Sequence, residues 1–427
     1  MAQTPLLILL ASDMNRQLWP LHDVAALRFG AEPLLVNQTQ RFQGMGFEQV
    51  VLVVNPRYQS ETNTLAEQLS GLQMRVVMQP EPKGVADALL QAGLAVGGDL
   101  SRPVYITRVH DIVDDVLHQA MLNAHFADKT IGLLACSEAD TPGTAMYAQL
   151  GEAGRVMAVS ERAAQGTFPS VLAHVHPDLA RLLNTLRKEY EQGSEQAYTR
   201  TLDTLVKGGA YRAVAARGIF GALDYPWQVL DVMNHYLTRI QGQIVAGSAF
   251  VSDRASIIGD VFIGAGARIF PGATISGPAY IGASTFIANN ALVRNCMILN
   301  NCEIGFNCEV ARSYIADNCS LHAATVLDSV FAQGVNFSAG CATANLRMDR
   351  SVVRSMIDGE ERDTGRRKLG GIVGRDAFIS VNCSIMPGVK VGARTQIGPG
   401  VALLHDVPDD SRAFVKQEMN IVERRGK

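Results

Sequence analysis

The sequence has little net charge, no paired cysteine motif and no long apolar run, and each absence excludes a class of protein. Its 38 lysines and arginines stand against 41 aspartates and glutamates, a formal net charge of −3, so neither nucleic acid nor a membrane surface is expected as a partner. The apolar stretch near the N-terminus covers only Leu6–Ala11, too short to cross a bilayer and without a basic segment or a cleavage site beside it. We therefore expect a cytoplasmic protein in which this stretch forms a buried strand.

The seven cysteines form no CxxC pair and do not combine with histidines at the spacing of a zinc site. Cys296, Cys302 and Cys308 recur at every sixth position instead. This spacing suits either a ladder of metal ligands or disulfides, or small apolar residues stacked on successive turns of a repeat. Because the sequence shows no secretion signal, we expect reduced thiols and favour the stacked apolar residues.

The main pattern in the sequence is an aliphatic residue at every sixth position. No helix has this period, and a plain strand has a period of two. A hexapeptide repeat is typical of a left-handed parallel β-helix, in which each face of a three-sided coil points one aliphatic side chain inward. The first uninterrupted run is Val251, Ile257, Ile263, Ile269, Ile275, Ile281, Ile287 and Val293.

The period resumes at Ile298 after a one-residue slip and returns again between Val373 and Leu403. Asparagines that follow the same period are predicted to take positive φ at the corners of the coil. These asparagines are Asn289, Asn295, Asn301 and Asn307.

Between Asn345 and Gly371 the aliphatic period stops and charged residues dominate. A long charged loop on a rigid solenoid usually carries function; the alternative is a solvated, disordered insert. The flat faces of such a prism also favour association. We expect a homo-oligomer, with a trimer favoured.

The N-terminal half alternates strand-like runs with segments of helical spacing, which predicts a doubly wound α/β sheet. Ligands of such sheets bind at the carboxyl ends of the strands. Pro226 opens a helix that leads into the repeat. We therefore expect an α/β domain in residues 1–244 and a β-helix domain in residues 245–427. The strand-like runs are Leu6–Ala11, Val50–Asn55, Arg75–Gln79, Val104–Val109 and Ile131–Cys136.

Short motifs stand in a recognisable order along both halves. In the first half they are Leu10-Ala11 with the loop that follows, Gln79 with Gly84, His110-Asp111, Glu161-Arg162, and Asp224-Tyr225-Pro226-Trp227. In the repeat they are the segments that run from His322 to Ser329 and from Ser338 to Asn345. This order resembles the sugar-1-phosphate nucleotidyltransferases with an appended hexapeptide domain, above all the bifunctional nucleotidyltransferase/acetyltransferase branch, over nearly the whole chain.

The resemblance assigns a nucleotide and metal site to the first half. It implies that Asp111 is a ligand of Mg²⁺ and that Glu161 and Arg162 bind the sugar. Asp224 stands two residues after the position of the family's second metal aspartate, and whether it compensates as a second ligand is left open. The nucleotide-binding positions that it implies are Leu10, Ala11, Gln79, Gly84 and Asp111.

The first half also departs from the family pattern. Both glycines of the phosphate-binding loop are missing, Asp13 has entered that loop, Gln17 stands in place of an arginine, and no Pro-Lys pair follows. Ala222 takes the place of the second metal aspartate. These groups would stabilise the charge of phosphoryl transfer. We therefore expect an impaired nucleotidyltransferase, with an active enzyme that makes a nucleotide sugar as an alternative.

The second half keeps more of the catalytic pattern. The resemblance makes His322 the general base that deprotonates the acceptor as it attacks acetyl-CoA, and Asn345 a residue that orients the substrate. A corner histidine with no chemical role is the alternative for His322. The basic positions that the resemblance assigns to coenzyme A or phosphate are Arg366, Arg367, Lys368 and Lys416.

Substrate-holding positions are less well kept, since Ala311, Thr325 and Cys341 replace a lysine, a tyrosine and a threonine of the family. We expect acyl transfer from acetyl-CoA to an amino or hydroxyl group of a sugar phosphate or nucleotide sugar. The alternatives are the active nucleotidyltransferase, and a non-catalytic regulatory or assembly subunit that binds nucleotide sugars or a partner enzyme.

Overall fold

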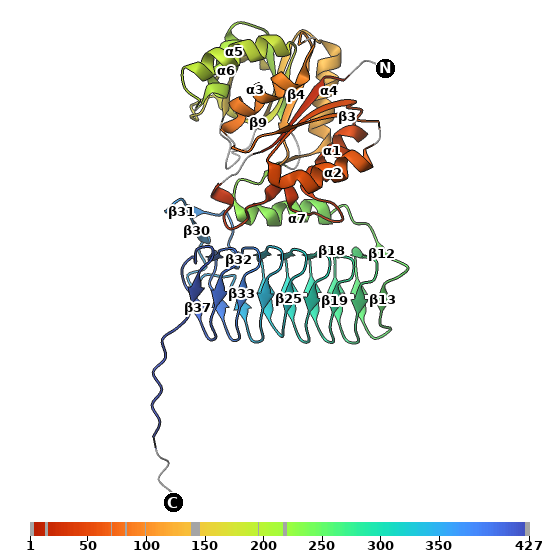
Figure 1. Ribbon diagram of the computed structural model, residues 1–427, viewed down its shortest axis with the longest axis vertical. Helices are drawn as coiled ribbons and strands as arrows, with labels where there is room; N and C mark the ends of the chain where they lie inside the picture. Colours follow the sequence, from red (N-terminus) through yellow and green to blue (C-terminus); the bar gives the residue numbers. More distant parts are fainter. Residues whose placement is uncertain are drawn as a thin grey trace, which may run out of the picture. The chain divides into compact units, whose positions relative to one another are not determined.

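The computed structural model of the chain forms two compact units, each described by itself below (Figure 1). The first unit consists of Met1–Asn15 and His22–Asp224, and the second of Arg16–Leu21 and Tyr225–Lys427. The residues that the structure describes are 4–12, 16–69, 71–81, 83–98, 100–137, 146–194, 196–216 and 220–422. The expected boundary near residue 245 coincides with the first strand of the repeat, whereas the helix before that strand groups with the second unit.

The first unit is built on a nine-stranded sheet. Its main path runs β10-β6-β9-β4-β1-β2-β3, and β9 is antiparallel to its neighbours β4 and β6. The hairpin of β7 and β8 extends the sheet through β9. The strands are β1 (Leu6–Ala11), β2 (Gln49–Val54), β3 (Gln73–Met78), β4 (Val104–Arg108), β6 (Gly132–Ser137), β7 (Tyr147–Leu150), β8 (Val156–Ser160), β9 (Thr167–His176) and β10 (Tyr211–Ala216).

The α-helices in the described part of this unit pack around the sheet, which confirms the expected α/β architecture. The packing of α3 on α5 is close, because a Cβ at Gly93 would lie 2.5 Å from Leu183. The helices are α1 (Leu34–Gly44), α2 (Gln59–Gln68), α3 (Gly84–Val96), α4 (Asp115–Ala127), α5 (Leu179–Glu191) and α6 (Ala197–Lys207). A small antiparallel pair is formed by β5 (Asp111–Val113) and β11 (Phe220–Ala222). Within the described ranges, no helix has the length and apolar character needed to cross a bilayer.

The second unit is a three-sided coil of short parallel strands, the left-handed parallel β-helix expected from the hexapeptide period (Figure 1). The first face consists of β12 (Gln243–Val245), β15 (Val261–Ile263), β18 (Ala279–Ile281), β21 (Met297–Ile298), β24 (Tyr314–Ile315), β27 (Val330–Phe331), β32 (Ile372–Val373) and β35 (Lys390–Val391).

The second face consists of β13 (Phe250–Val251), β16 (Arg268–Ile269), β19 (Phe286–Ile287), β22 (Glu303–Ile304), β25 (Ser320–Leu321), β28 (Asn336–Phe337), β33 (Phe378–Ile379), β36 (Gln396–Ile397) and β38 (Arg412–Ala413). The third face consists of β14 (Ser256–Ile258), β17 (Thr274–Ser276), β20 (Leu292–Arg294), β23 (Glu309–Ala311), β26 (Thr325–Leu327), β29 (Ala342–Thr343), β34 (Ser384–Ile385) and β37 (Ala402–Leu403).

Aliphatic side chains fill the interior of the coil as predicted. Ile263, Ile269 and Ile275 are fully buried in one continuous core. Cys296, Cys302 and Cys308 are free and buried in the same core, so stacked small apolar residues, not a disulfide ladder, account for their spacing. The slip in the period is a shortening of the coil, because paired core positions lie 18 residues apart at Ile263 and Ile281 but 17 apart at Ile298 and Ile315.

Three of the four predicted corner asparagines have positive φ: Asn295 (53°), Asn301 (56°) and Asn307 (55°). The prediction for Asn289 is wrong, because its neighbour Asn290 takes the left-handed conformation at φ 58°. Residues 289 and 290 form a two-residue turn, and the second residue of the turn carries the positive φ. The hexapeptide period locates the turn but not the order of residues within it.

The charged insertion between β29 and β32 forms an ordered hairpin of β30 (Arg354–Ile357) and β31 (Glu360–Asp363). Val353 and Ile357 are buried beneath it. The hairpin contacts the segment before the coil, since Arg362 Nη1 donates to Tyr225 Oη at 3.0 Å. That segment continues as α7 (Val229–Leu237), which packs on β24 of the first face. The insertion is therefore packed structure within the second unit.

The N-terminal segment Arg16–Leu21 is also part of the second unit. Trp19 donates its indole N–H to Asp409 at 2.8 Å, and the ammonium of Lys390 lies 5.2 Å from the centre of the indole ring. Lys390 is only 2% exposed and forms an ion pair with Asp406 at 3.2 Å. Half of the segment that resembles the phosphate-binding loop is thus held on the solenoid.

Two buried histidines of β9 belong to a hydrogen-bonded network inside the first unit. His174 Nδ1 lies 2.9 Å from Tyr198 Oη, and His176 Nδ1 lies 2.9 Å from Tyr211 Oη. Burial lowers the pKa of His176 to about 3. His176 is therefore neutral at physiological pH.

We predict that Ile275→Ala lowers the free energy of unfolding by roughly 2–5 kcal/mol, because it opens a cavity in a core that cannot collapse between stacked coils. Urea denaturation of the purified protein measures this change. The matched control is Thr274→Ala, on the outward side of the same strand, which should change the free energy of unfolding little. Equal effects of the two variants would contradict the inward orientation of the ladder.

The burial of His176 predicts that stability falls in mild acid. Below about pH 6.5 this histidine binds a proton in the unfolded chain but not in the folded chain. The contribution of His176 to the free energy of unfolding is therefore fully present above that pH and is lost progressively toward pH 3. Between pH 8 and pH 5 the loss from this group is about 2 kcal/mol. Urea unfolding at both pH values should show a smaller pH dependence for His176→Gln than for the wild type; an unchanged dependence would contradict the assignment.

Candidate functional site

The carboxyl ends of the central strands bring the predicted nucleotide-binding positions of the first unit together. Leu10 pairs with Arg108 of β4, and Ala11 pairs with Val54 of β2. Gln79 follows β3 and donates its backbone N–H to Val54 O at 2.8 Å. The loop residue Asp13 lies outside the described residues. Leu10, Ala11 and Gln79 therefore share one edge of the sheet, as the strand pattern predicts.

The side chain of Gln79 is engaged within the protein. Ser12 Oγ donates to its carbonyl oxygen, and its amide nitrogen donates to Asp87 on α3. Gln79 and Ser12 are each only 4% exposed. Gly84 begins α3 at φ +87°, with open space beside it. A base that bound to the side-chain amide of Gln79 would have to displace Ser12 or Asp87.

Asp111, the expected metal ligand, is paired with an arginine. Arg108 Nε lies 2.8 Å from Asp111 Oδ2, and Arg108 Nη2 lies 2.7 Å from Asp111 Oδ1. The Asp111 side chain is fully buried. Burial raises the pKa of its carboxyl, and the guanidinium opposes that rise. Both carboxylate oxygens therefore already have a cationic partner.

The remaining expected ligands do not assemble a Mg²⁺ site around Asp111. Ala222 lies directly opposite Asp111 in the pairing of β5 and β11, and an alanine offers no oxygen ligand. Asp224 is buried two residues beyond it. No cluster of three or more His, Cys, Asp or Glu side chains suited to a metal ion occurs in the described parts of the chain. Mg²⁺ is usually held by one or two protein carboxylates together with water and phosphate oxygens. Because both oxygens of Asp111 are bonded to Arg108 and an alanine stands opposite Asp111, the residues present do not fit it.

The predicted sugar-binding pair borders a cavity of about 760 Å³ between β8 and the helices α5 and α6. Glu161 accepts a hydrogen bond from Thr199 of α6 at 3.0 Å. Arg162 lines the same cavity, together with Arg200 and Asp203. Glu161 and Arg162 thus both line this cavity, whose other lining residues are mostly polar or charged.

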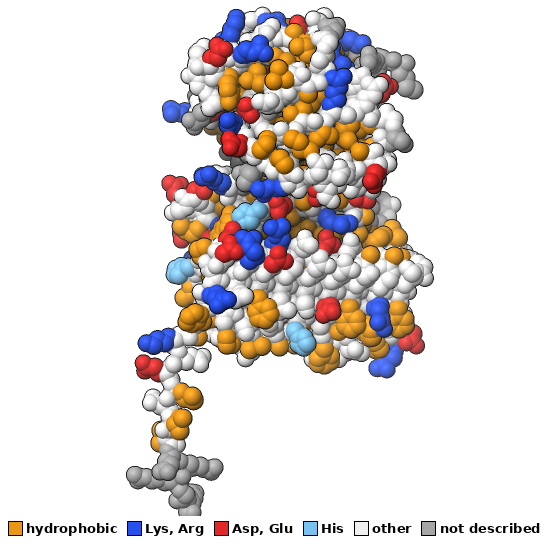
Figure 2. All heavy atoms as spheres, in the orientation of Figure 1, with side chains coloured by type: hydrophobic (Ala, Val, Ile, Leu, Met, Phe, Trp, Pro, Cys, Tyr) orange, Lys and Arg blue, Asp and Glu red, His pale blue; other side chains and the backbone are white. Residues whose placement is uncertain are grey.

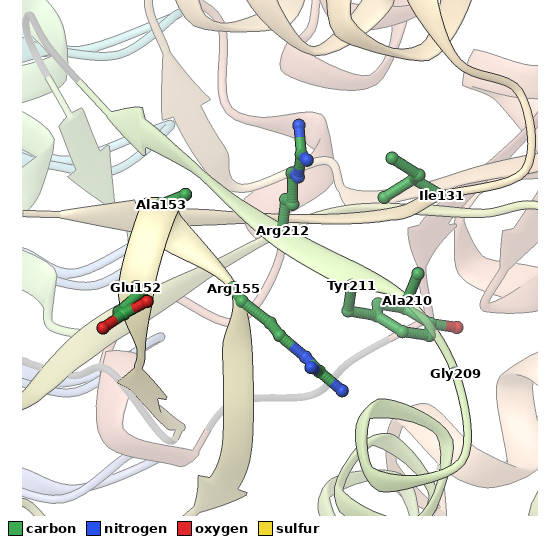
Figure 3. Close-up of a pocket in the computed structure, with 8 residues that line it drawn as sticks. All are labelled: Ile131, Glu152, Ala153, Arg155, Gly209, Ala210, Tyr211 and Arg212. Carbon is green, nitrogen blue, oxygen red and sulfur yellow. The ribbon is translucent and has the colours of Figure 1, made fainter.

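A second cavity, of about 380 Å³, lies at the far edge strand β10 (Figure 3). Its wall contains Glu152, Arg155 and Arg212. Figure 3 shows the two arginine side chains pointing in different directions, so they do not converge on one anion. We assign this cavity no role.

His322 of the second unit is an exposed side chain on a fixed corner. It follows β25 of the second face, and its backbone N–H donates to Phe337 O at 3.0 Å. Cys308 supports the corner from inside, since its thiol donates to Leu321 O at 3.5 Å and accepts from Ala324 N at 3.3 Å. Burial raises the pKa of the Cys308 thiol, which keeps it a hydrogen-bond donor. The imidazole is therefore presented to solvent on rigid backbone.

Asn345 lies in an ordered polar stack at the next corner. Its amide nitrogen donates to Asp328 Oδ2 at 2.5 Å. Arg312 forms two hydrogen bonds to the same carboxylate, at 2.7 and 2.8 Å. Asp328 is 5% exposed. The three residues follow one another by about one coil length, so each lies above the last; the family motif alone does not identify Arg312 and Asp328.

The two chain segments at the base of the insertion place basic residues beside Asn345. Leu369 N donates to Asn345 O at 3.0 Å, and Leu346 forms an antiparallel bridge with Lys368. Lys368 and its neighbour Arg367 are exposed. Arg366 instead forms an ion pair with Asp231 of α7.

One chain does not bring all of the predicted acyl-transfer residues together. His322 lies at the corner where the second face passes to the third, whereas Asn345 follows β29 at the other end of the third face. A strand of three residues, roughly 10 Å, separates these corners. Lys416 lies beyond β38 in an exposed tail, several coils from His322.

The corner that carries a lysine in the resembling family is changed. Ala311 is fully buried in its place, and the nearby Glu309 pairs with Arg294. Arg312 is committed to Asp328.

Two family models match the chain. Residues 7–168 match the model described as "Nucleotidyl transferase", and residues 257–351 match the model described as "GMPPB C-terminal domain". The first match covers the edge of the sheet that carries Leu10, Ala11 and Gln79. The second match covers the corners of His322 and Asn345.

Known relatives are similar along most of the chain. The "Bifunctional protein GlmU" of Methanococcus maripaludis strain S2 is 29% identical over 356 residues, which cover 82% of either chain. The protein of the same name from strain C7 is 34% identical over 299 residues, 68% of this chain and 71% of that protein. The "Bifunctional sugar-1-phosphate nucleotidylyltransferase/acetyltransferase" of Sulfurisphaera tokodaii is 34% identical over 215 residues, 50% of this chain and 53% of that protein.

Among solved structures, a UDP-glucose pyrophosphorylase complexed with UDP-glucose matches with a TM-score of 0.48 and 14% identity. The match covers 56% of this chain and all of that one.

The stacked pair of Arg312 and Asp328 predicts a measurable coupling free energy. A double-mutant cycle of Arg312→Ala and Asp328→Ala, followed by urea unfolding, should give about 1–2 kcal/mol, less than a fully buried pair because Arg312 is 40% exposed. The matched control is Arg394 with Asp410, which has the same two-bonded geometry with both partners exposed and should show a smaller coupling. Equal coupling in the two pairs would contradict a special role of burial at the Asn345 corner.

Proposed function

Because the chain belongs to the family of GlmU-type bifunctional sugar-1-phosphate nucleotidyltransferase/acetyltransferases, we propose that its second unit is an acetyl-CoA-dependent acyltransferase. The acceptor is an amino or hydroxyl group of a sugar phosphate or nucleotide sugar. The observation that carries this proposal is His322, an exposed imidazole on a corner fixed from inside by Cys308. A base that must meet two substrates needs both this access and this rigidity.

The reaction follows from the chemistry of the two corners. A neutral His322 imidazole removes a proton from the acceptor as its nitrogen or oxygen attacks the thioester carbonyl. The carbon–sulfur bond then breaks, the acetyl group remains on the acceptor, and the thiolate of coenzyme A receives the proton from the imidazolium. Asp328 accepts a hydrogen bond from the side-chain amide nitrogen of Asn345. The side-chain carbonyl of Asn345 is then left to accept a hydrogen bond from the acceptor.

A homo-oligomer, with a trimer favoured, would complete such a site. His322 and Asn345 occupy opposite ends of one face, so a second copy would set its Asn345 corner against His322. Figure 2 shows apolar side chains exposed along the lower edge of the solenoid. Exposed aromatic side chains of the second face and its corners include Phe250, Phe306 and Phe378. Such side chains favour association in water.

Cations for coenzyme A or phosphate would come from the base of the insertion and from the tail. Arg367 and Lys368 are exposed beside Asn345, and Lys416 would have to come from another copy or from movement of the tail. Arg366 would orient the insertion through Asp231. The buried Ala311 supports an acceptor held differently from that of the resembling family.

The first unit is proposed to hold a nucleotide sugar without efficient phosphoryl transfer. The edge of Leu10, Ala11, Gln79 and Gly84 and the cavity of Glu161 and Arg162 support binding. The pairing of Asp111 with Arg108 and the alanine at position 222 argue against Mg²⁺-assisted catalysis.

The purified full-length protein should release coenzyme A from acetyl-CoA when sugar phosphates or nucleotide sugars with a free amino or hydroxyl group are supplied. His322→Ala should lower this rate by about 100-fold or more, since general-base catalysis contributes at least that factor. The control is His405→Ala, an exposed histidine elsewhere on the solenoid, which should retain the wild-type rate. Liberated thiol, read by absorbance, reports the reaction.

Three outcomes would count against this assignment. An unchanged rate in His322→Ala would exclude that residue as the base. Failure to bind acetyl-CoA would favour a regulatory subunit. Pyrophosphate release at ordinary enzyme rates from NTP, Mg²⁺ and a sugar 1-phosphate would favour the active nucleotidyltransferase.

A further inference from the structure

We infer that Arg108 takes the place of the divalent cation at the nucleotide edge of the first unit, so that this edge works without a metal ion. The inference concerns the first unit and stands whether or not the second unit transfers acyl groups. It rests on the geometry of Arg108 and Asp111, on the residue opposite Asp111, and on the charge balance of the buried carboxylate.

Arg108 is hydrogen-bonded to both oxygens of the Asp111 carboxylate. Two nearly parallel hydrogen bonds of 2.8 and 2.7 Å join the guanidinium to the two oxygens of Asp111. This two-bonded geometry is the strong and directional form of the pair. A Mg²⁺ ion bound to the same oxygens would lie within a few ångströms of the guanidinium and would be repelled by it in a poorly solvated site.

The backbone holds the two partners together. Arg108 ends β4, Asp111 begins β5, and only a two-residue turn separates them. Val109 N donates to Leu10 O at 2.9 Å, and Leu223 N donates to His110 O at 3.1 Å. The backbone of the turn that joins Arg108 to Asp111 is therefore tied to β1 on one side and to the segment after β11 on the other.

A second carboxylate is absent from the position that faces Asp111. Ala222 is its direct partner in the antiparallel pair of β5 and β11. An aspartate at this position would supply the second ligand of a two-carboxylate site. The alanine and the arginine together replace a two-carboxylate metal site with a neutral ion pair.

The charge balance explains why the arginine is needed. An ionised carboxylate that is fully buried is costly unless a cation or hydrogen bonds compensate it. Arg108, whose side chain is 21% exposed, supplies that charge permanently, because a guanidinium does not lose its proton. Folding and ligand binding at this edge then need no bound metal.

The test is whether metal binding is absent from the wild type and appears when the arginine is removed. Wild-type full-length protein, titrated with Mn²⁺ and followed by electron paramagnetic resonance, should bind no stoichiometric Mn²⁺, and its Tm should not change with MgCl₂. The double variant Arg108→Met with Ala222→Asp should bind about one Mn²⁺ per chain and gain about 5 °C or more in Tm with saturating metal.

Two controls separate this result from general destabilisation. Adding Asp111→Asn to the double variant should abolish both the Mn²⁺ binding and the rise in Tm. Arg41→Met removes a comparable arginine, whose partner is Asp115; it should lower Tm without creating a response to metal.

The inference is overturned if crystals of the wild type soaked in Mn²⁺ show anomalous density at Asp111, a measurement that depends on no variant folding. It is also overturned if the double variant folds, as judged by its circular dichroism, and binds no Mn²⁺. Neither result bears on the His322 assay, so failure here and failure of the proposed acyl transfer are distinguishable.

Discussion

The aliphatic ladder inside the three-sided coil is the constraint on which the second unit depends. Once Ile263, Ile269 and Ile275 point inward, the successive coils stack at about the normal spacing of neighbouring strands, 4.8 Å. Residues one coil apart in the sequence then become neighbours. This stacking places Arg312, Asp328 and Asn345 in one hydrogen-bonded column and presents His322 on a separate corner.

The two units keep different parts of the family pattern for physical reasons. In the second unit the corner backbone is held by the core, so an exposed imidazole keeps its position while nearby substrate-holding residues change. In the first unit the buried carboxylate of Asp111 is compensated by Arg108, and an alanine stands opposite it.

The sequence predicts the coil well because one inward residue in six repeats over many turns. It predicts the corner turns less well, as Asn289 and Asn290 show, because the period does not determine which residue of a turn has positive φ. The contact of Asp328 with Arg312 could not be read from spacing, since coil lengths change from 18 to 17 to 16 residues along the solenoid. The α/β alternation, by contrast, predicts β1, which carries Leu10, and β3, which Gln79 follows.

The ion pair of Arg108 with Asp111 has a signal in the sequence, but the family resemblance assigns Asp111 a different role. Arg108 lies three residues before Asp111, which is close enough for an ion pair across a turn. The resemblance instead implies that Asp111 is a metal ligand. The grouping of Trp19 with the second unit has no local signal, because its partners Lys390 and Asp409 are distant in the sequence. Contacts of this kind follow from the fold and not from any motif.

The central claim is that acyl transfer takes place at the corner of His322. A crystal structure of the full-length protein soaked with acetyl-CoA tests it most directly. The account predicts density for the thioester carbonyl within about 3–4 Å of the His322 imidazole. It also predicts that the Asn345 corner of a second copy lies against that imidazole. Coenzyme A bound with its thioester at another corner, or absent from a fully soaked crystal, would contradict the account.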